Sequence, residues 1–162
     1  LLGVYSSLKP HIDTETKRLV FVCHGNICRS AFADLAARKL GLQSISCGLA
    51  AKDGDPAFAR AIEAARLYQV DLSLHQATKI SPALLQAGDL VLAMEPKHIK
   101  QLQPYARPDV RFGLLGLYGA NATAFLHDPY SCNANYFHHC FQRIENAVRH
   151  LKMEPPPKST GM

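Results

Sequence analysis

A short apolar run near the start of the chain constrains the fold more than any other feature. Residues 18–22, "RLVFV", contain four consecutive apolar side chains, which is typical of a strand buried on both faces of a parallel sheet. The stretch "CHGNICRS" follows at once, and residues 31–40 then carry apolar side chains at helical spacing until Gly41. The sequence therefore predicts a strand, a loop and a helix in direct succession.

Strands and helices continue to alternate along the rest of the chain. The pattern predicts further strands at 43–47, 89–93 and 110–112, helices at 56–68, from 81, at 96–105 and at 134–152, and a loop over 113–133. Such alternation predicts an α/β fold with three layers, α/β/α, around a central four-stranded parallel sheet. Ligands in these sheets bind outside the carboxyl ends of the strands, where the loop after the first strand lies.

Length and composition suit one compact domain. The chain has 162 residues, of which 48% are hydrophobic, enough for a sizeable core. We expect an irregular N-terminal extension over residues 1–17, one folded domain over 18–152 and a disordered, proline-containing tail over 153–162. No apolar run approaches the roughly 18 residues of a membrane span, and no signal peptide is evident, so membrane insertion is not expected.

The cysteine content indicates the redox compartment of the protein, and the net charge indicates the kind of partner that it binds. Five cysteines, an odd number, argue against a disulfide framework and predict a reducing compartment, the cytoplasm. The net charge of +5 favours an acidic partner. No stretch shows the dense Lys/Arg clusters of a nucleic-acid face, so nucleic acid is not expected as that partner.

The stretch after the first predicted strand has the residues of a nucleophilic phosphate site. A curled loop can aim its backbone N–H groups at one anion above Cys23, and the dipole of the following helix favours the thiolate form. Gly25 and Asn26 suit the tight backbone. Arg29 offers a planar fork for two phosphate oxygens, and Ser30 can donate a hydrogen bond to the sulfur. The candidate phosphate-binding loop comprises His24, Gly25, Asn26, Ile27, Cys28 and Ser30.

Other interpretations of the cysteines are weaker or stay open. A zinc site needs further ligands at short spacing, and no second pair follows Cys23 and Cys28, so we expect neither a metal nor a cofactor. Cys47 and Cys140 are interpreted as core packing. Cys28 either forms a reversible disulfide with Cys23 on oxidation or contributes only its backbone N–H to the loop.

The sequence resembles the low-molecular-weight protein tyrosine phosphatases, whose signature is a Cys, five residues and Arg-Ser after the first strand. The resemblance extends over residues 18–151. Its motifs are 20–30 (VFVCHGNICRS), 46–48 (SCG), 71–75 (DLSLH), 94–95 (ME) and 128–130 (DPY). Residues 48–49, 54–56 and 94–99 look most like the bacterial members that serve exopolysaccharide or capsule systems.

Two Asp-Pro pairs compete for the role of general acid, which typically contributes about 10²–10⁴-fold in rate. Asp55-Pro56 directly precedes a helical pattern and is interpreted as a helix cap. Asp128-Pro129 lies in a glycine-rich loop, and the resemblance also implies Asp128 as the acid. Pro129 would restrict the backbone that holds this carboxyl.

The resemblance implies supporting roles for other side chains. Ser46 and His75 would hold the strained Asn26. Tyr130 would stack on the substrate ring, and Leu49 would stand at the pocket rim where some members carry a bulky aromatic residue. Ala31 replaces the usual proline after Arg-Ser.

Together the motif and the resemblance imply a phosphatase domain over 18–152 that hydrolyses phosphotyrosine and small aryl phosphates through a phosphocysteine. The product would be inorganic phosphate, and the partner a phosphotyrosine protein, with a bacterial tyrosine autokinase of polysaccharide export as the implied candidate. Ile27 favours phosphotyrosine because arginine-phosphate-specific relatives carry Thr there. Arsenate reduction, which needs two cysteines absent from 83–105, and a non-catalytic phosphate-binding module are the alternatives.

Overall fold

The fold is built around a four-stranded parallel sheet, as the sequence predicts. The computed structural model describes residues 2–153, so most of the predicted tail lies outside the described residues. The strands are β1 (Arg18–Cys23), β2 (Ser44–Gly48), β3 (Asp89–Ala93) and β4 (Arg111–Leu114), in the order β2-β1-β3-β4. The two central strands are the most apolar, because both of their faces are covered.

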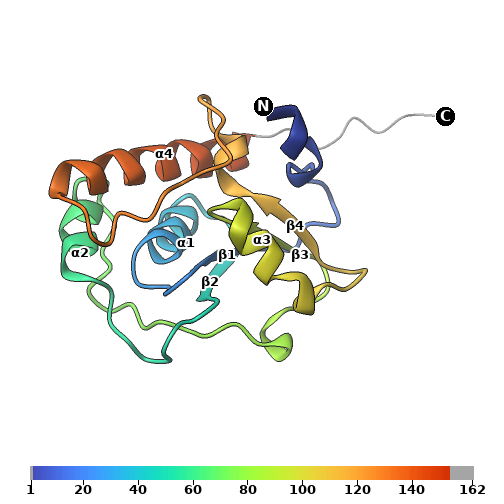
Figure 1. Cartoon of the computed structure of the whole chain (residues 1–162), viewed down its shortest axis with the longest axis horizontal. Helices are drawn as coiled ribbons and strands as arrows, with labels where there is room; N and C mark the ends of the chain where they lie inside the picture. The colour runs from blue at the N-terminus through green and yellow to red at the C-terminus, as the bar shows by residue number, and fades with distance from the viewer. Residues whose placement is uncertain (1, 154–162) are drawn as a thin grey trace.

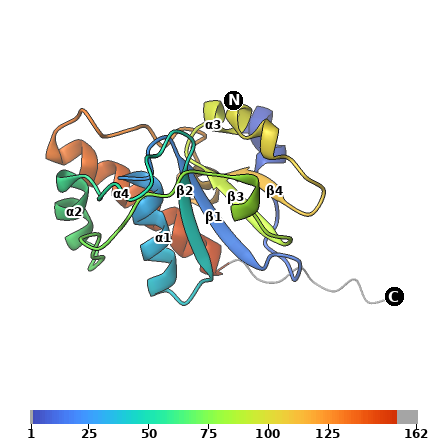
Figure 2. The same cartoon turned by 90° about the horizontal axis from the view of Figure 1, so that it is seen from below.

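Four α-helices within residues 2–153 complete the three layers. They are α1 (Arg29–Lys39), α2 (Ala59–Arg66), α3 (Pro96–Gln101) and α4 (Ala134–Met153). Figures 1 and 2 show α1, α2 and α4 on one side of the sheet and α3 on the other. Alternate residues of β1 supply the two cores: Leu19 and Phe21 pack towards α1, α2 and α4, whereas Val20 and Val22 pack towards the α3 side. The predicted α/β/α architecture is confirmed.

The sheet register brings three strand ends to one edge. Cys23 at the end of β1 pairs with Gly48 of β2, and Val22 pairs with Ala93 of β3. A Cβ atom added to Gly48 would lie 2.8 Å from the backbone oxygen of His24 and 2.9 Å from the backbone nitrogen of Asn26. Only glycine therefore lets the loop after β1 lie so close to β2.

The prediction that Asp55-Pro56 caps a helix is wrong. Helix α2 begins at Ala59, three residues later than the predicted start. Pro56 instead pairs with Gln76 in an isolated antiparallel bridge, and the backbone oxygen of Asp55 accepts a hydrogen bond from Ala77 N at 2.8 Å. A tertiary contact between two connecting segments thus overrides the local capping pattern.

Further elements differ from the predictions, and the helix predicted from 81 is only a 3₁₀ turn, Pro82–Leu84. Helix α1 begins at Arg29, two residues before the predicted start, so the helix follows directly after Cys28 of the loop. The predicted helix at 96–105 is split into α3 and a 3₁₀ turn, Gln103–Tyr105, by Pro104. The predicted loop over 113–133 contains the end of β4 and a 3₁₀ turn, Leu115–Tyr118.

The N-terminal extension is more ordered than the sequence predicts. Leu2–Leu8 form a 3₁₀ helix. The hydroxyl of Tyr118 donates to the backbone oxygen of Pro10, and Arg111 pairs with Asp13 at 3.0 Å. These contacts attach the extension to β4 and to the turn that follows it. In the part of the chain that the structure describes, no helix has the length and apolar character needed to cross a membrane.

The larger core depends on aromatic packing between α1 and α4. The rings of Phe32 and Phe141 are stacked with centroids 4.1 Å apart and planes at 1°. We expect Phe32→Ala to lower the free energy of unfolding by about 3–5 kcal/mol because it leaves a buried cavity. Urea unfolding checks this. Leu67→Ala, at a side chain that is 70% exposed, should change stability by less than about 0.5 kcal/mol; equal effects of the two substitutions would contradict the prediction.

Candidate active site

The loop between β1 and α1 forms the floor of a small cavity. The cavity has a volume of about 170 Å³ and is lined by Cys23, His24, Gly25, Ile27, Cys28, Arg29, Asp128 and Tyr130. No side chain of the described residues caps the N-terminus of α1. The first N–H groups of that helix are thus available to an anion, and its dipole favours negative charge there.

A buried chain of hydrogen bonds runs behind the loop to the sulfur of Cys23. Asn26 Nδ2 donates to Ser30 Oγ at 2.8 Å, and Ser30 Oγ lies 3.0 Å from Cys23 Sγ. Ser30 Oγ accepts from the amide, and its one hydrogen can point either at the sulfur or at the backbone oxygen of Cys47, which is 3.4 Å away. A hydroxyl hydrogen that points at a sulfur favours negative charge on that sulfur.

Asn26 maintains the curled shape of the loop through its backbone conformation and its hydrogen bonds. Its φ of 56° lies in the left-handed region, which asparagine tolerates better than most residues. Its Oδ1 accepts from Thr78 N at 2.9 Å, and its backbone oxygen lies 2.6 Å from His75 Nε2. The structure therefore places His75 against Asn26, whereas no hydrogen bond joins Ser46 to Asn26 among the residues described.

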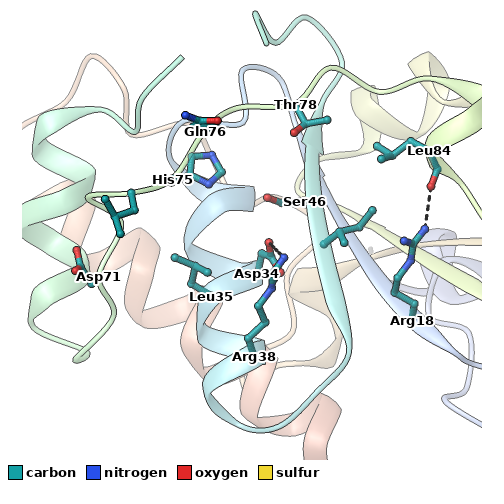
Figure 3. Close-up of a pocket in the computed structure, with 12 residues that line it drawn as sticks. Arg18, Asp34, Leu35, Arg38, Ser46, Asp71, His75, Gln76, Thr78 and Leu84 are labelled. Atoms are coloured by element: carbon teal, nitrogen blue, oxygen red, sulfur yellow. Dashed lines mark hydrogen bonds and ion pairs between the residues drawn. The ribbon is translucent and has the colours of Figure 1, made fainter. Parts of the chain in front are cut away.

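A larger cavity of about 470 Å³ lies on the other side of these supporting residues. Figure 3 shows His75 and Thr78 at one end of it, with Ser46 on β2 between α1 and Arg18. Its charged side chains are engaged within the chain: Arg38 Nε donates to Asp34 at 2.9 Å, and Arg18 Nη2 donates to the backbone oxygen of Leu84 at 2.9 Å (Figure 3). No cysteine lines it, in contrast to the smaller cavity, which both Cys23 and Cys28 line.

Arg29 is buried at the centre of the site, with 2% of its surface exposed. Its Nη1 donates to Glu95 Oε1 at 2.6 Å and to the backbone oxygen of Leu126 at 2.8 Å. Its Nη2 lies 3.5 Å from Asp128 Oδ2. One guanidinium thus connects the phosphate loop, the end of β3 and the loop that carries Asp128.

Asp128 faces the cavity from the segment before α4. Its Oδ1 accepts a hydrogen bond from Tyr130 N at 3.0 Å, which is an Asx turn. The side chain is 45% exposed, so a ligand or water in the cavity can reach its other oxygen. The ring of Tyr130 packs on Phe58 with centroids 4.7 Å apart, which places an aromatic wall beside the cavity.

Comparison with known proteins identifies the family. The family model of the low molecular weight phosphotyrosine protein phosphatases matches residues 18–156. The chain belongs to this family. It is therefore an enzyme of the protein-tyrosine-phosphatase class.

Individual relatives agree with this membership. The low molecular weight protein-tyrosine-phosphatase Etp of Escherichia coli is 34% identical over 132 residues, which cover 80% of this chain and 88% of Etp. The solved structure of Vibrio vulnificus Wzb in complex with benzylphosphonate is 32% identical, covers 85% of this chain and 99% of Wzb, and has a TM-score of 0.75. The arginine phosphatase YwlE also has a TM-score of 0.75, over 85% of this chain and 94% of that protein, but at 23% identity it shows the fold alone.

The predicted site residues of this phosphatase do not all line the small cavity, and Ser46 and His75 line the larger one. Most of the loop lines the cavity with Asp128 and Tyr130, whereas Asn26 and Ser30 are fully buried behind it. Leu49 does not line the cavity: its N–H donates to Cys23 O at 3.0 Å, and its side chain packs on the core at the α3 side of the sheet. Within residues 2–153, no group of three or more His, Cys, Asp or Glu side chains is arranged to hold a metal ion.

Glu95 is a residue of this site to which sequence reasoning assigned no role. The resemblance included it, and a carboxylate at the end of a buried strand is the signal that could have drawn attention to it. Burial alone raises the pKa of the Glu95 carboxyl, but the hydrogen bond and charge of Arg29 outweigh this and hold the pKa below its ordinary value. The backbone N–H of Thr78, which donates to Asn26 Oδ1, was also missed. Almost every residue has such a donor, so the sequence does not distinguish this one.

The charge of Arg29 is maintained by its neighbours. Burial alone lowers the pKa of the guanidinium, but the negative charges of Cys23, Asp128 and Glu95 raise it above its ordinary value. Arg29 is therefore fully protonated and carries its positive charge at the cavity.

We expect Glu95→Gln to lower kcat/KM for an aryl phosphate by about 10–100-fold, because it weakens the orientation of Arg29.

The Glu95→Gln substitution should also lower the free energy of unfolding at pH 7 by about 1.5–3 kcal/mol, the range for hydrogen bonds to charged groups. The folded pKa of Glu95 is depressed, so this stability is present above the unfolded pKa and is lost as the pH falls through the folded pKa. Urea unfolding of both proteins at neutral and acidic pH should therefore show the difference shrinking below about pH 4.5. A difference that grows on acidification would contradict this.

Cysteine reactivity should separate the nucleophile from the other buried thiols. Burial raises the pKa of Cys47 to about 12 and that of Cys140 to about 12, and it raises the pKa of Cys28 as well. These groups are therefore thiols at neutral pH, and a thiol is a poor nucleophile. We expect iodoacetate at pH 7 to alkylate Cys23 well before Cys47 or Cys140, and inorganic phosphate to protect Cys23. Peptide mapping by mass spectrometry measures this, and labelling in denaturant is the control. Equal native labelling of Cys23 and Cys47 would contradict it.

Proposed function

We propose that this phosphatase hydrolyses phosphotyrosine in proteins through a phosphocysteine formed on Cys23. The observation that carries the proposal is the convergence of a thiol, a buried guanidinium and a partly exposed carboxyl on one cavity of about 170 Å³. The activity is assigned to residues 18–152. The family supports the substrate class, and the five free cysteines support a reducing compartment such as the cytoplasm.

In the first step the thiolate of Cys23 attacks phosphorus. The S–P bond forms while the bond from phosphorus to the tyrosine oxygen breaks, and Asp128 gives its proton to the departing phenolate. Arg29 and the N–H groups of the loop hold the equatorial phosphate oxygens, so that the charge of the transition state is stabilised by groups already in place.

In the second step a water molecule attacks the phosphocysteine. Asp128, now a carboxylate, takes a proton from this water, the P–S bond breaks and inorganic phosphate leaves. The sulfur departs as a thiolate, which accepts the hydrogen bond of Ser30. The pair of Asn26 and Ser30 thus acts in both steps, by stabilising the same form of Cys23.

Ile27 supports phosphotyrosine over phosphoarginine as the substrate. Its apolar side chain lines the cavity, where it suits an aromatic ring better than a guanidinium. The exposed ring of Tyr130 on the same rim favours the same choice, since aromatic rings pack favourably on one another. A bacterial tyrosine autokinase of polysaccharide export is the candidate substrate protein, and trapping of phosphoproteins by Asp128→Ala tests that assignment.

We expect Cys23→Ser to abolish turnover of p-nitrophenyl phosphate, because the hydroxyl is not ionised at neutral pH. Asp128→Asn should lower kcat by about 10²–10⁴-fold and still form the phosphoenzyme, which rapid quenching detects. Cys132→Ser and Asp55→Asn, a cysteine and an Asp-Pro pair outside the cavity, are the matched controls and should keep full activity. Full activity of Cys23→Ser would overturn the mechanism.

A further inference from the structure

A groove runs beside the loop that carries Asp128, between this loop and α4. One hollow of about 340 Å³ is lined by Phe125, Leu126, His127, Tyr136, His139, Cys140 and Arg143. A second hollow of about 390 Å³ shares Leu126, His139 and Arg143 with the first, so the two are continuous. Figure 1 shows the segment before α4 running back along that helix. We call these two hollows the α4 groove.

The α4 groove and the active-site cavity share one wall. His127 lines the groove and Asp128, the next residue, lines the cavity; their Cα atoms are about 3.8 Å apart. The wall is anchored from both sides, because Leu126 O accepts from Arg29 at 2.8 Å and Cys140 Sγ donates to His127 O at 3.5 Å. A peptide that enters the cavity through its phosphotyrosine can therefore reach the groove within a few residues.

Exposed aromatic rings gather around this wall. Among the described residues the exposed large hydrophobic side chains are Val4, Leu67, Leu74, Phe125, Tyr130 and Tyr136. All three aromatic members line either the groove or the active-site cavity: Phe125 and Tyr136 the groove, and Tyr130 the cavity. The ring of Phe125 stacks on His127 with centroids 5.6 Å apart. Exposed aromatic rings next to an arginine are typical of surfaces that bind other proteins.

The charge of the α4 groove is positive and unbalanced. No Asp or Glu is among the residues that line either hollow. Arg143 has no hydrogen bond or ion pair within residues 2–153, in contrast to Arg149 on the same helix, which pairs with Glu145 at 2.6 Å. Arginine is always charged at neutral pH and binds carboxylates through two N–H groups. His127 and His139 add further nitrogen donors around it.

We propose that the α4 groove binds an acidic side chain of the phosphoprotein substrate, close in sequence to the phosphotyrosine, with Arg143 as its ionic partner. The stem of that side chain packs between Phe125 and Tyr136. This inference rests on the proposed function, because it names the kind of sequence that the same active site prefers. Arg143 is then a specificity residue that acts on the substrate segment and takes no part in the chemistry.

A peptide series tests the proposal. Phosphotyrosine peptides of otherwise neutral sequence carry a single Glu, or its uncharged counterpart Gln, at each position on either side of the phosphotyrosine. We expect kcat/KM to be about 3–10-fold higher for Glu than for Gln at neighbouring positions on one side, the range for a partly exposed ion pair. The preference should weaken as NaCl is added.

Substitutions of Arg143 locate the preference. In Arg143→Ala the ratio of Glu to Gln kcat/KM should fall to about one, and in Arg143→Glu a peptide with Lys at that position should become the better substrate. A ratio compares two substrates of the same variant, so a general loss of activity does not change it. Arg149→Ala is the matched control, on the same helix and outside the groove, and should keep the wild-type ratio.

The outcomes separate this inference from the function on which it rests. Turnover of p-nitrophenyl phosphate by the wild-type protein with no preference for Glu at any position would overturn the inference alone. A preference that survives in Arg143→Ala would also overturn it. Failure to hydrolyse any aryl phosphate would overturn the proposed function, and the inference with it.

Discussion

The buried guanidinium of Arg29 is the interaction on which the site depends. It donates to Glu95 after β3 and to the backbone of Leu126, and it faces Asp128. A charge with only 2% of its surface exposed is costly unless it is paired and hydrogen-bonded. The fold meets this requirement with groups from the end of β3 and from the segment before α4, and the same contacts place Asp128 at the cavity that Cys23 lines.

The loop between β1 and α1 depends in turn on hydrogen bonds to Asn26. The left-handed backbone of Asn26 persists because its side chain and backbone oxygen are held by Ser30, Thr78 and His75. The same amide donates to the hydroxyl of Ser30, which lies 3.0 Å from Cys23 Sγ. The shape of the loop and the surroundings of this sulfur thus depend on one network.

Sequence reasoning predicted the strands best and the connecting segments least well. The strands were identifiable because residues buried on both faces of a sheet must be apolar, as in β1 and β3. Asp55-Pro56 was misread as a helix cap, since its actual role is a bridge to Gln76, far along the chain. Leu49 was predicted at the rim because of the resemblance, but its partly buried side chain, directly after β2, packs against the core on the α3 side of the sheet.

The sequence by itself determined the chemistry: a cysteine, a curled loop and an arginine between a buried strand and a helix, because these groups are neighbours along the chain and local spacing sets their geometry. Only the tertiary structure decided what completes the site. Glu95 and Leu126 lie 66 and 97 residues from Arg29 in sequence and still share its guanidinium. Such contacts follow from strand order and from the packing of α4, and a residue's position along the chain does not reveal which distant groups the fold brings beside it.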